Sequence, residues 1–162
     1  MAAPAWRPMH AGDLPDVERI SAIVHPRYPE REEVPAERLR LFPAGCLIAT
    51  RDGVAIGYAI AHPGVLGHPP ALDTLLGALP ADADCLYVHD VALLPDARGL
   101  RLGAAATEYL ANVARDHGLR CLALTAVNNS TDFWSRQGFS AEQIDKSLAS
   151  YGEDAAYMVR KL

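Results

Sequence analysis

Residues 94–105, Leu-Pro-Asp-Ala-Arg-Gly-Leu-Arg-Leu-Gly-Ala-Ala, join an apolar stretch of the chain to an amphipathic one. The apolar stretch, Leu86 to Leu94, predicts a buried strand. From Leu102 to His117 apolar residues recur at helical spacing, and Gly118 suits the left-handed residue that often follows a helix. The segment therefore predicts a strand, a tight turn and a long helix in direct succession.

The turn between this strand and helix has the composition of an anion site. The first N–H groups of a helix lack partners and lie at the positive end of its dipole, so they can hold phosphate oxygens. Gly99 and Gly103 let a ligand approach the backbone, and Arg98 and Arg101 add charged donors. An ordinary turn with solvated arginines is the alternative. Neither the Walker nor the Rossmann glycine pattern is present.

Upstream of this segment, the chain predicts a short apolar opening at Trp6–Met9 and a helix that begins after Asp13 and ends at His25-Pro26. A weaker pattern predicts a second helix from about Pro35 to Leu41. The strand Cys46–Thr50 then turns at Asp52-Gly53 into a second strand, Val54–His62, because this dipeptide favours a two-residue hairpin. Residues 63–84, rich in proline and glycine, predict a loop or lid with one short helix at Leu72–Leu79.

Downstream, Cys121–Val127 predicts an apolar strand, followed by a short helix at Ser130–Arg136, a turn at Gly138 and two extended stretches, the last ending in Tyr157-Met158-Val159. Helices alternate with strands only in this half of the chain. The element order β-α-α-β-β-β-α-β-α-β-β therefore predicts a mixed sheet with a single parallel crossover.

Composition limits the class of protein. The 162 residues, half of them apolar, predict a single domain over 1–162. A net charge of −5 gives no reason to expect a nucleic-acid partner. No apolar run approaches the roughly 18 residues of a membrane span, and no signal peptide is indicated. Three cysteines without metal-ligand spacing favour buried thiols, no metal site and a cytoplasmic location.

At this point the chain resembles the GCN5-related N-acetyltransferase (GNAT) superfamily. Its signature, Q/R-x-x-G-x-G/A, is matched by Arg98 at the first position and Gly103 at the last, whereas Arg101 replaces the first glycine. The resemblance extends over nearly the whole chain. It includes the opening strand and helix, the second hairpin, and STDFWSRQGF at 130–139, which is similar to the family's short helix ending in F-Y-x-x-x-G-F.

The resemblance implies an α/β fold with a mixed, mostly antiparallel sheet of about six to seven strands, flanked by about four helices. It implies acetyl-CoA as co-substrate in the cleft where the fourth and fifth strands splay apart, with the Val91 N–H facing the thioester oxygen. The implied cofactor contacts are Val91, Ala92 and Leu93 for the pantetheine, Arg98, Gly99, Leu100, Arg101, Leu102, Gly103 and Ala104 for the pyrophosphate, and Asn128, Ser130, Phe133, Trp134 and Arg136 on the other side.

An ammonium acceptor, with a pKa of about 10, needs a base before it can attack a thioester. His89 lies on the strand beside the expected acetyl site, where some relatives have a histidine. Strand alternation places it on the face of Val91 and opposite Asp90. A cleft histidine that only bonds the backbone is the alternative. The other five histidines lie at loop starts or helix ends, where solvated roles are expected.

The sequence contains several candidates for the residue that protonates the leaving thiolate. Many relatives have a tyrosine after the phenylalanine of the short helix, but this chain has Trp134, whose indole N–H is too weak an acid. The sulfur can leave as a thiolate or take a proton from water, or Ser130, Tyr87 or Tyr151 can substitute for the tyrosine. Of these, Tyr151 falls in a loop that often borders the acceptor pocket in the superfamily. Asp90 is expected to form a structural salt bridge or cap, with amine recognition as the other option.

These observations predict an N-acetyltransferase that acts on a primary amine of a small molecule by direct transfer in a ternary complex. The excess of acidic over basic residues favours a cationic amine as the acceptor. Two alternatives stay open: a module that senses acetyl-CoA without catalysis, and an interaction domain without a cofactor. The resemblance also leaves a homodimer open.

Overall fold

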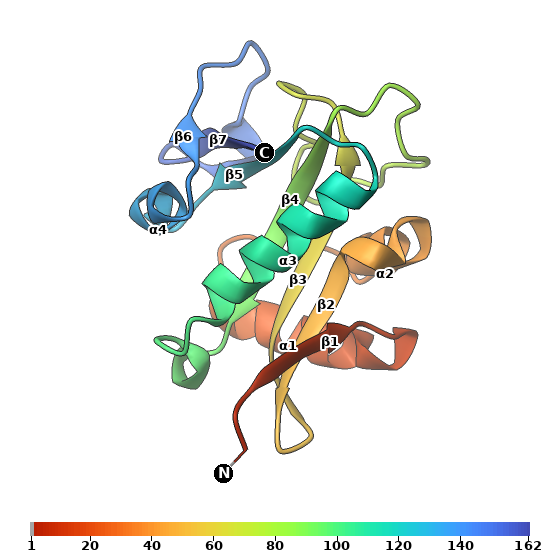
Figure 1. Ribbon diagram of the computed structural model, residues 1–162, viewed down its shortest axis with the longest axis vertical. Helices are drawn as coiled ribbons and strands as arrows, with labels where there is room; N and C mark the ends of the chain where they lie inside the picture. Colours follow the sequence, from red (N-terminus) through yellow and green to blue (C-terminus); the bar gives the residue numbers. More distant parts are fainter. Residues whose placement is uncertain (1) are drawn as a thin grey trace.

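The computed structural model describes residues 2–162. Within them, seven strands form one sheet in the order β1-β2-β3-β4-β5-β7-β6 (Figure 1). The element order agrees with the one that the sequence predicts. The elements are β1 (Ala5–Pro8), α1 (Leu14–Val24), α2 (Glu33–Leu41), β2 (Cys46–Arg51), β3 (Val54–Gly64), β4 (Cys85–Leu93), α3 (Leu102–Asp116), β5 (Cys121–Ala126), α4 (Thr131–Arg136), β6 (Ser140–Ala141) and β7 (Ala156–Lys161).

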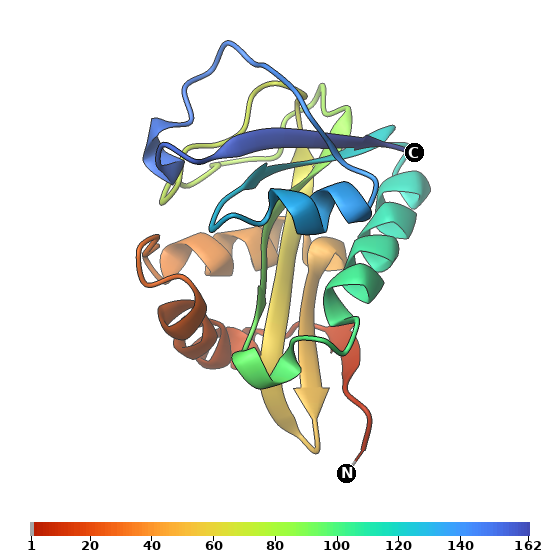
Figure 2. The ribbon, with the colours of Figure 1, turned by 90° about the vertical axis from the view of Figure 1, so that its left-hand side faces the viewer.

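Helices cover both faces of the sheet. In Figure 2, α1 and α2 lie on one side and α3 lies on the other. Buried Leu110 of α3 and Trp134 of α4 pack with Leu122 in the core of the α3 face. Val17 and Ile20 of α1 belong to the core of the opposite face. Both cores are apolar, and their burial supplies the main stabilising free energy of the fold. No helix within residues 2–162 is long and apolar enough to cross a bilayer.

Local sequence signals correctly predict the turns and helix ends that follow. Asp52 and Gly53 both have left-handed backbone, with φ of 52° and 77°, as a two-residue hairpin turn requires. Helix α1 ends at Val24, and its C-cap His25 directly precedes Pro26. Gly118, with φ of 71°, follows α3 and allows the chain to turn towards β5. The hairpin and the end of the long helix are thus confirmed.

The sheet opens in its centre. β4 pairs with β3 along both strands, but it pairs in parallel with β5 only over Leu86–Val88. Beyond Val88 the two strands separate, and β5 and β7 run across the direction of β2 and β3 (Figure 2). This confirms the mixed sheet, the single parallel pair among the described strands and the splayed centre. The open edge of β4 is where the candidate site lies.

A β-bulge in β4 changes which side chains share a face. Ile60 of β3 pairs with Asp90, whereas Ala61 pairs with Val88, so His89 is the extra residue. Such an insertion interrupts the strict alternation of a strand. Val91 packs on the core that α3 covers, whereas Asp90 bonds to Tyr58 on the α1 face. Consequently His89 and Asp90 both face the α1–α2 side of the sheet.

The connection between β3 and β4, residues 65–84, contains no helix or strand, so the predicted short helix at 72–79 is wrong. Asp73 and Gly77 have φ of 58° and 76°. Left-handed residues at these two positions interrupt any helix between them. The segment, called the roof loop below, is instead held by hydrogen bonds to α2 and to the region around β7.

Candidate functional site

A cleft of about 1030 Å³ opens where β4 and β5 separate. Its walls come from β4, the start of α3, α4 and the connection between α1 and α2. Most residues that the sequence analysis singled out line this cleft. They are His89, Val91, Leu93, Arg98, Gly99, Arg101, Leu102, Gly103, Ala104, Asn128, Ser130, Phe133, Trp134, Arg136 and Tyr151.

Two predicted cofactor residues do not line the cleft. Ala92 is fully buried in the core beneath α1, because strand alternation turns it away from Val91. Leu100 is 41% exposed at the outside of the turn. Neither side chain is therefore placed to contact a ligand in the cleft.

The turn before α3 is shaped by two left-handed residues. Gly99 has φ of 80°, and Arg101, which is the N-cap of α3, has φ of 61°. Arg101, which replaces the first glycine of the family signature, thus adopts a left-handed backbone that glycine can adopt at no steric cost. The Ala105 N–H donates to the Arg101 carbonyl at 3.0 Å. The helix N–H groups before Ala105 have no carbonyl four residues back within the helix, and they belong to residues 102–104, which line the cleft.

Gly103 allows α3 and α4 to approach each other. A Cβ atom at this position would lie 2.7 Å from the Phe133 ring. Phe133 in turn stacks edge-on against Trp134, with ring centroids 4.9 Å apart. Glycine is therefore required here by helix packing, in addition to any contact with a ligand.

His89 forms a pair with a residue that the sequence analysis missed. Its Nε2 lies 2.7 Å from Oε1 of Glu30, in the connection between α1 and α2, and its side chain is only 2% exposed. Burial alone would raise the pKa of Glu30, but the His89 hydrogen bond and the backbone N–H of Asp73 outweigh burial and lower it. The ionised carboxylate can only accept, so Nε2 donates to it, and in the neutral imidazole Nδ1 carries the lone pair.

A second histidine–carboxylate pair lies beside the first. His25 Nε2 is 2.7 Å from Asp90 Oδ1, and the Tyr58 hydroxyl donates to Asp90 Oδ2 at 2.5 Å. Burial opposes both charges, but each partner outweighs it, so the pKa of Asp90 is lowered and the pKa of His25 is raised. The Asn128 amide lies 3.4 Å from His25 Nδ1, so His25 spans the cleft from β4 to the end of β5.

The bulge corrects two predictions about these groups. His89 does not share a face with Val91, and Asp90 does not point away from His89. The salt bridge expected for Asp90 is present, with His25 as its partner. The solvated role expected for His25 is wrong, because its side chain is 13% exposed and paired. The dipeptide His25-Pro26 marked the end of α1, but only packing against β4 brings the imidazole to Asp90.

Tyr151 lies in a hydrogen-bonded row at the far end of the cleft. Its hydroxyl donates to the Pro70 carbonyl at 2.8 Å and lies 3.2 Å from the Tyr87 hydroxyl, which is 2.9 Å from Thr125 Oγ1. Burial raises the pKa of Tyr151 to about 12. The position expected beside the cleft is therefore found, but the proton of this hydroxyl is already engaged with Pro70.

Other candidate groups have structural contacts. Ser130 Oγ donates to the Val127 carbonyl at 2.6 Å. Trp134 is 9% exposed and packs against Phe139, with ring centroids 5.3 Å apart. The buried thiols expected of the cysteines are present, and burial raises the pKa of both Cys46 and Cys85 to about 12. Within residues 2–162, no group of three or more His, Cys, Asp or Glu residues is arranged to hold a metal.

His62 is also buried, contrary to the solvated role expected of it. The residue is only 1% exposed, and its Nδ1 lies 2.9 Å from the Pro63 carbonyl oxygen. Its ring centroid is 6.4 Å from that of His89. His10, His68 and His117 are exposed, as expected.

Comparison with known proteins identifies the family. A model described as the acetyltransferase (GNAT) family matches residues 14–139, which is more than half of the chain. The chain belongs to the GNAT family. The matched region of this GNAT chain begins at α1 and ends three residues after α4, so it contains the turn, both histidine–carboxylate pairs, and Phe133 and Trp134 of the cleft.

Individual GNAT relatives agree with this assignment. A mycothiol acetyltransferase from Cellulomonas flavigena is 32% identical over 139 residues, which cover 78% of this chain and 37% of that protein. The chain therefore spans little more than a third of that relative's length. The loading GNATL domain of CurA from Lyngbya majuscula superposes with a TM-score of 0.83 at 12% identity, covering 99% of this chain and 98% of that one.

A second solved structure is the N-acetylglutamate synthase from Neisseria gonorrhoeae, complexed with coenzyme A and N-acetyl-glutamate. It superposes with a TM-score of 0.69 at 22% identity and covers 100% of this chain and 36% of that one. At such identities the two structural comparisons show the GNAT fold alone. They confirm the expected mostly antiparallel sheet with its flanking helices.

Proposed function

We propose that this chain binds acetyl-CoA between β4 and β5 and transfers the acetyl group to a primary amine of a small molecule, in a ternary complex. One observation carries the proposal: a single cleft joins the N-terminus of α3 to two histidine–carboxylate pairs on the other side of the opened sheet. An anion site and a proton-accepting site are thus parts of one space, as transfer from a phosphorylated carrier to an amine requires.

The turn at 98–104 fits a diphosphate. It combines the unpaired N–H groups of the first turn of α3 with the side chains of Arg98 and Arg101. Beyond Val88 the edge of β4 facing β5 has no strand partner, so the backbone around Val91 is available to the pantetheine arm and to the thioester oxygen. The Neisseria synthase, solved with coenzyme A, supports the same ligand class.

His89 is assigned as the base, with Glu30 as its positioning residue. Because Glu30 accepts the Nε2 proton, Nδ1 of the neutral ring is left as an acceptor, which is buried and has no hydrogen-bond partner within residues 2–162. Nδ1 takes the ammonium proton of the acceptor directly or through one water. The neutral amine then attacks the thioester carbon, the C–S bond breaks and the thiolate leaves, and the nitrogen of the new amide loses its second proton to water.

The charge of the cleft favours a cationic acceptor. Glu30 and Asp90 both have a lowered pKa, so both carboxylates are ionised at neutral pH. They lie on the same side of the sheet, facing the cleft beyond the edge of β4. An alkylammonium group is attracted to this position, whereas a carboxylate acceptor would be repelled.

His25 is the group in the cleft best placed to return a proton to the thiolate. Asp90 outweighs burial and raises the pKa of His25, which favours its protonated imidazole, and Nδ1 lies 3.4 Å from the Asn128 amide across the cleft. Replacing His25 with glutamine should lower kcat by about 10²-fold. In the unaltered protein, kcat should fall at high pH as His25 loses its proton, and this alkaline fall should be absent from H25Q. An unchanged alkaline limb in H25Q would assign the proton to another donor.

Acetyl transfer can be separated from binding alone. Thiol release from acetyl-CoA, followed over a panel of primary amines, should show turnover with cationic amines and none with their N-acetylated forms. Trp134 stands where many relatives have a tyrosine, and its side chain packs in the core. This replacement favours the second candidate function, a module that binds acetyl-CoA without catalysis. Heat of binding in calorimetry without turnover on any amine would establish that candidate instead.

The anion site has its own test. Replacing Arg98 with alanine removes one charged donor from the turn and should weaken CoA binding by about 10–100-fold. Binding of pantetheine, which lacks the diphosphate, should not change. Arg120→Ala, at an exposed position beyond the other end of α3, is the matched control and should bind both molecules normally. Equal loss for CoA and pantetheine would place the diphosphate elsewhere.

A further inference from the structure

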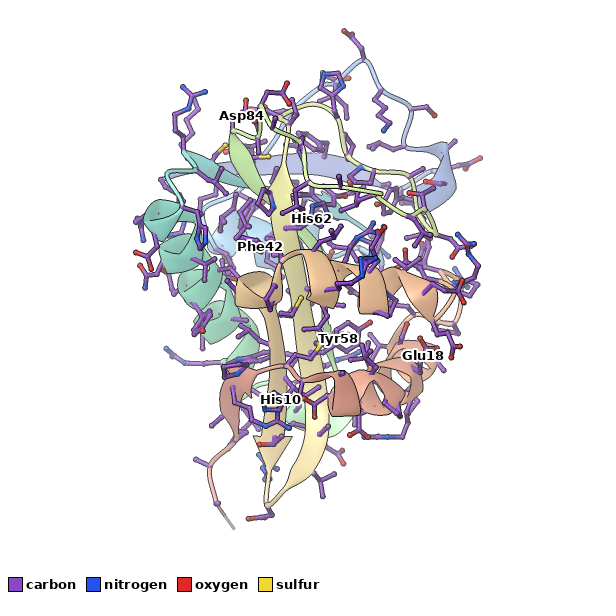
Figure 3. All side chains as sticks on the ribbon, turned by 90° about the vertical axis from the view of Figure 1, so that its right-hand side faces the viewer. His10, Glu18, Phe42, Tyr58, His62 and Asp84 are labelled. Carbon is purple, nitrogen blue, oxygen red and sulfur yellow. The ribbon has the colours of Figure 1, made fainter. Side chains whose placement is uncertain are left out.

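The roof loop is fixed over the sheet at several points. It leaves β3 beyond His62 and joins β4 after Asp84, and Figure 3 labels both residues. Glu37 of α2 accepts the N–H groups of Leu76 and Gly77 at 2.7 and 3.0 Å. Glu37 is buried, so these bonds are shielded from water. The loop therefore has a defined position relative to the cleft.

Residues 70–73 of the roof loop lie beside the cleft, between two other connections of the chain. Leu72 lines the cleft together with Glu30, in the connection between α1 and α2. The Leu72 N–H donates to Ser150 Oγ at 3.0 Å, which ties this segment to the connection between β6 and β7. The next residue, Asp73, contacts the connection between α1 and α2. The three connections thus meet beside the Glu30 carboxylate.

Asp73 exchanges hydrogen bonds with Glu30 and Arg31. Its N–H donates to Glu30 Oε2 at 2.9 Å. In return, the Arg31 backbone N–H donates to Asp73 Oδ1 at 2.7 Å, and Arg31 Nη2 donates to the Asp73 carbonyl at 3.1 Å. The hydrogen bond from the Arg31 backbone is the main cause that lowers the pKa of Asp73, so its carboxylate is ionised at neutral pH and accepts strongly. The main chain and the side chain of Asp73 are therefore both engaged with the same connection.

The backbone of Asp73 suits this exchange. Its φ of 58° lies in the left-handed region. Asp and Asn adopt this region more readily than other residues with a Cβ atom, because their short polar side chains can form local hydrogen bonds. Alanine at this position would lose both the side-chain acceptor and the preference for this backbone.

Both oxygens of the Glu30 carboxylate are consequently used. Oε1 lies 2.7 Å from His89 Nε2, and Oε2 accepts the Asp73 N–H. The last torsion of a glutamate side chain is soft, so a single hydrogen bond leaves the plane of the carboxylate free to turn. A second bond from a fixed backbone removes that freedom and aims Oε1 at the imidazole. His89 then keeps its proton on Nε2.

We propose that Asp73 is a positioning residue for the base: it fixes Glu30, and through Glu30 it sets the orientation and the tautomer of His89. The proposal rests on the proposed function, because it takes His89 as the base. It gives the roof loop a part in acetyl transfer without direct contact with the reacting atoms. The diphosphate site proposed at the turn before α3 is a separate part of the cleft, so the effect is expected on kcat and not on acetyl-CoA binding.

Two substitutions of Asp73 separate this role from a general effect on the loop. Asp73→Ala removes the acceptor for Arg31 and disfavours the left-handed backbone, so the N–H is no longer aimed at Glu30. It should lower kcat about tenfold and leave the KM for acetyl-CoA unchanged. Asp73→Asn keeps the side-chain oxygen and the left-handed backbone, so it should recover most of kcat. Asp82→Ala, at an exposed position of the same loop, is the matched control and should have normal kcat.

The tautomer of His89 can be measured without acetyl-CoA and without an acceptor. In mildly alkaline solution, the ring ¹⁵N resonances of the unaltered protein should show the proton on Nε2. Asp73→Asn and Asp82→Ala should give the same spectrum. Asp73→Ala should show a mixture of the two tautomers, because the Glu30 carboxylate is no longer held in one plane.

The proposal is overturned if Asp73→Ala leaves the His89 resonances unchanged, or if Asp73→Asn loses as much kcat as Asp73→Ala. It is equally overturned if the unaltered protein carries the His89 proton on Nδ1, a result that needs no variant. A mixture of tautomers together with an unaltered kcat in Asp73→Ala would instead overturn the assignment of His89 as the base. The resonances thus test the contact itself, and kcat tests the function on which the proposal rests.

Discussion

His89→Gln should lower kcat by about 10²–10⁴-fold, the range expected when a positioned base is lost. Glutamine is chosen because its amide still donates to Glu30, so no buried carboxylate is left without a partner. Acetyl-CoA affinity should change little, because the bulge turns His89 away from the face on which Val91 lies. Steady-state kinetics at saturating acetyl-CoA and calorimetry with CoA measure the two quantities.

The control for this variant is His117→Gln, at the exposed end of α3, which should have normal kcat. Glu30→Gln tests the positioning role: it should lower kcat without changing CoA affinity, because Nε2 of His89 is no longer held by a charge. An unaltered kcat in His89→Gln would discard His89 as the base. The His25–Asp90 pair would then be the remaining histidine–carboxylate pair described in the cleft.

The second large effect is on stability in acid. His62 is neutral and buried, and its pKa is lowered from 6.5 to about 3. Between these values the unfolded chain takes up a proton that the folded protein does not, so stability falls as the pH falls. From pH 7 to pH 4.5 the free energy of unfolding should decrease by about 3 kcal/mol through this residue alone. Urea unfolding at the two pH values measures the change.

Comparison with His62→Phe isolates this contribution. The charged or titratable groups that act on His62 are Arg38 and Glu37 from α2 and His89 from β4, and the variant leaves all three in place. The variant should therefore lose about 3 kcal/mol less than the unaltered protein over this pH interval. His68→Phe, in which an exposed histidine is removed, should keep the full loss. Parallel pH profiles for His62→Phe and the unaltered protein would show that His62 is not the group responsible.

The cofactor half of the candidate site could be predicted because its signals are local. The apolar strand, the glycine and arginine residues of the turn, and the amphipathic helix follow one another without interruption from Leu86 to His117. Backbone preferences and periodicity act over a few residues, and they are sufficient for such a segment. Even Arg101, a departure from the family pattern, occupies the expected turn, with φ of 61°.

The acceptor half could not be predicted, because it depends on contacts between distant segments. Glu30 lies 59 positions from His89, and His25 lies 65 positions from Asp90. Nothing near either residue in the chain marks it as a partner. In addition, strand alternation gave the wrong orientation for His89 relative to Val91 and Asp90, because one extra residue enters the pairing of β4 with β3.

The amino-acid sequence by itself determined the order of the elements, the hairpin at Asp52-Gly53, the helix ends and the turn before α3, since each follows from steric and hydrogen-bonding preferences of neighbouring residues. Only the tertiary structure decided which histidines are buried, which carboxylates hold them and where the roof loop lies. The physical reason is that burial and ion pairing act through space, and the β4 bulge arises from register between strands.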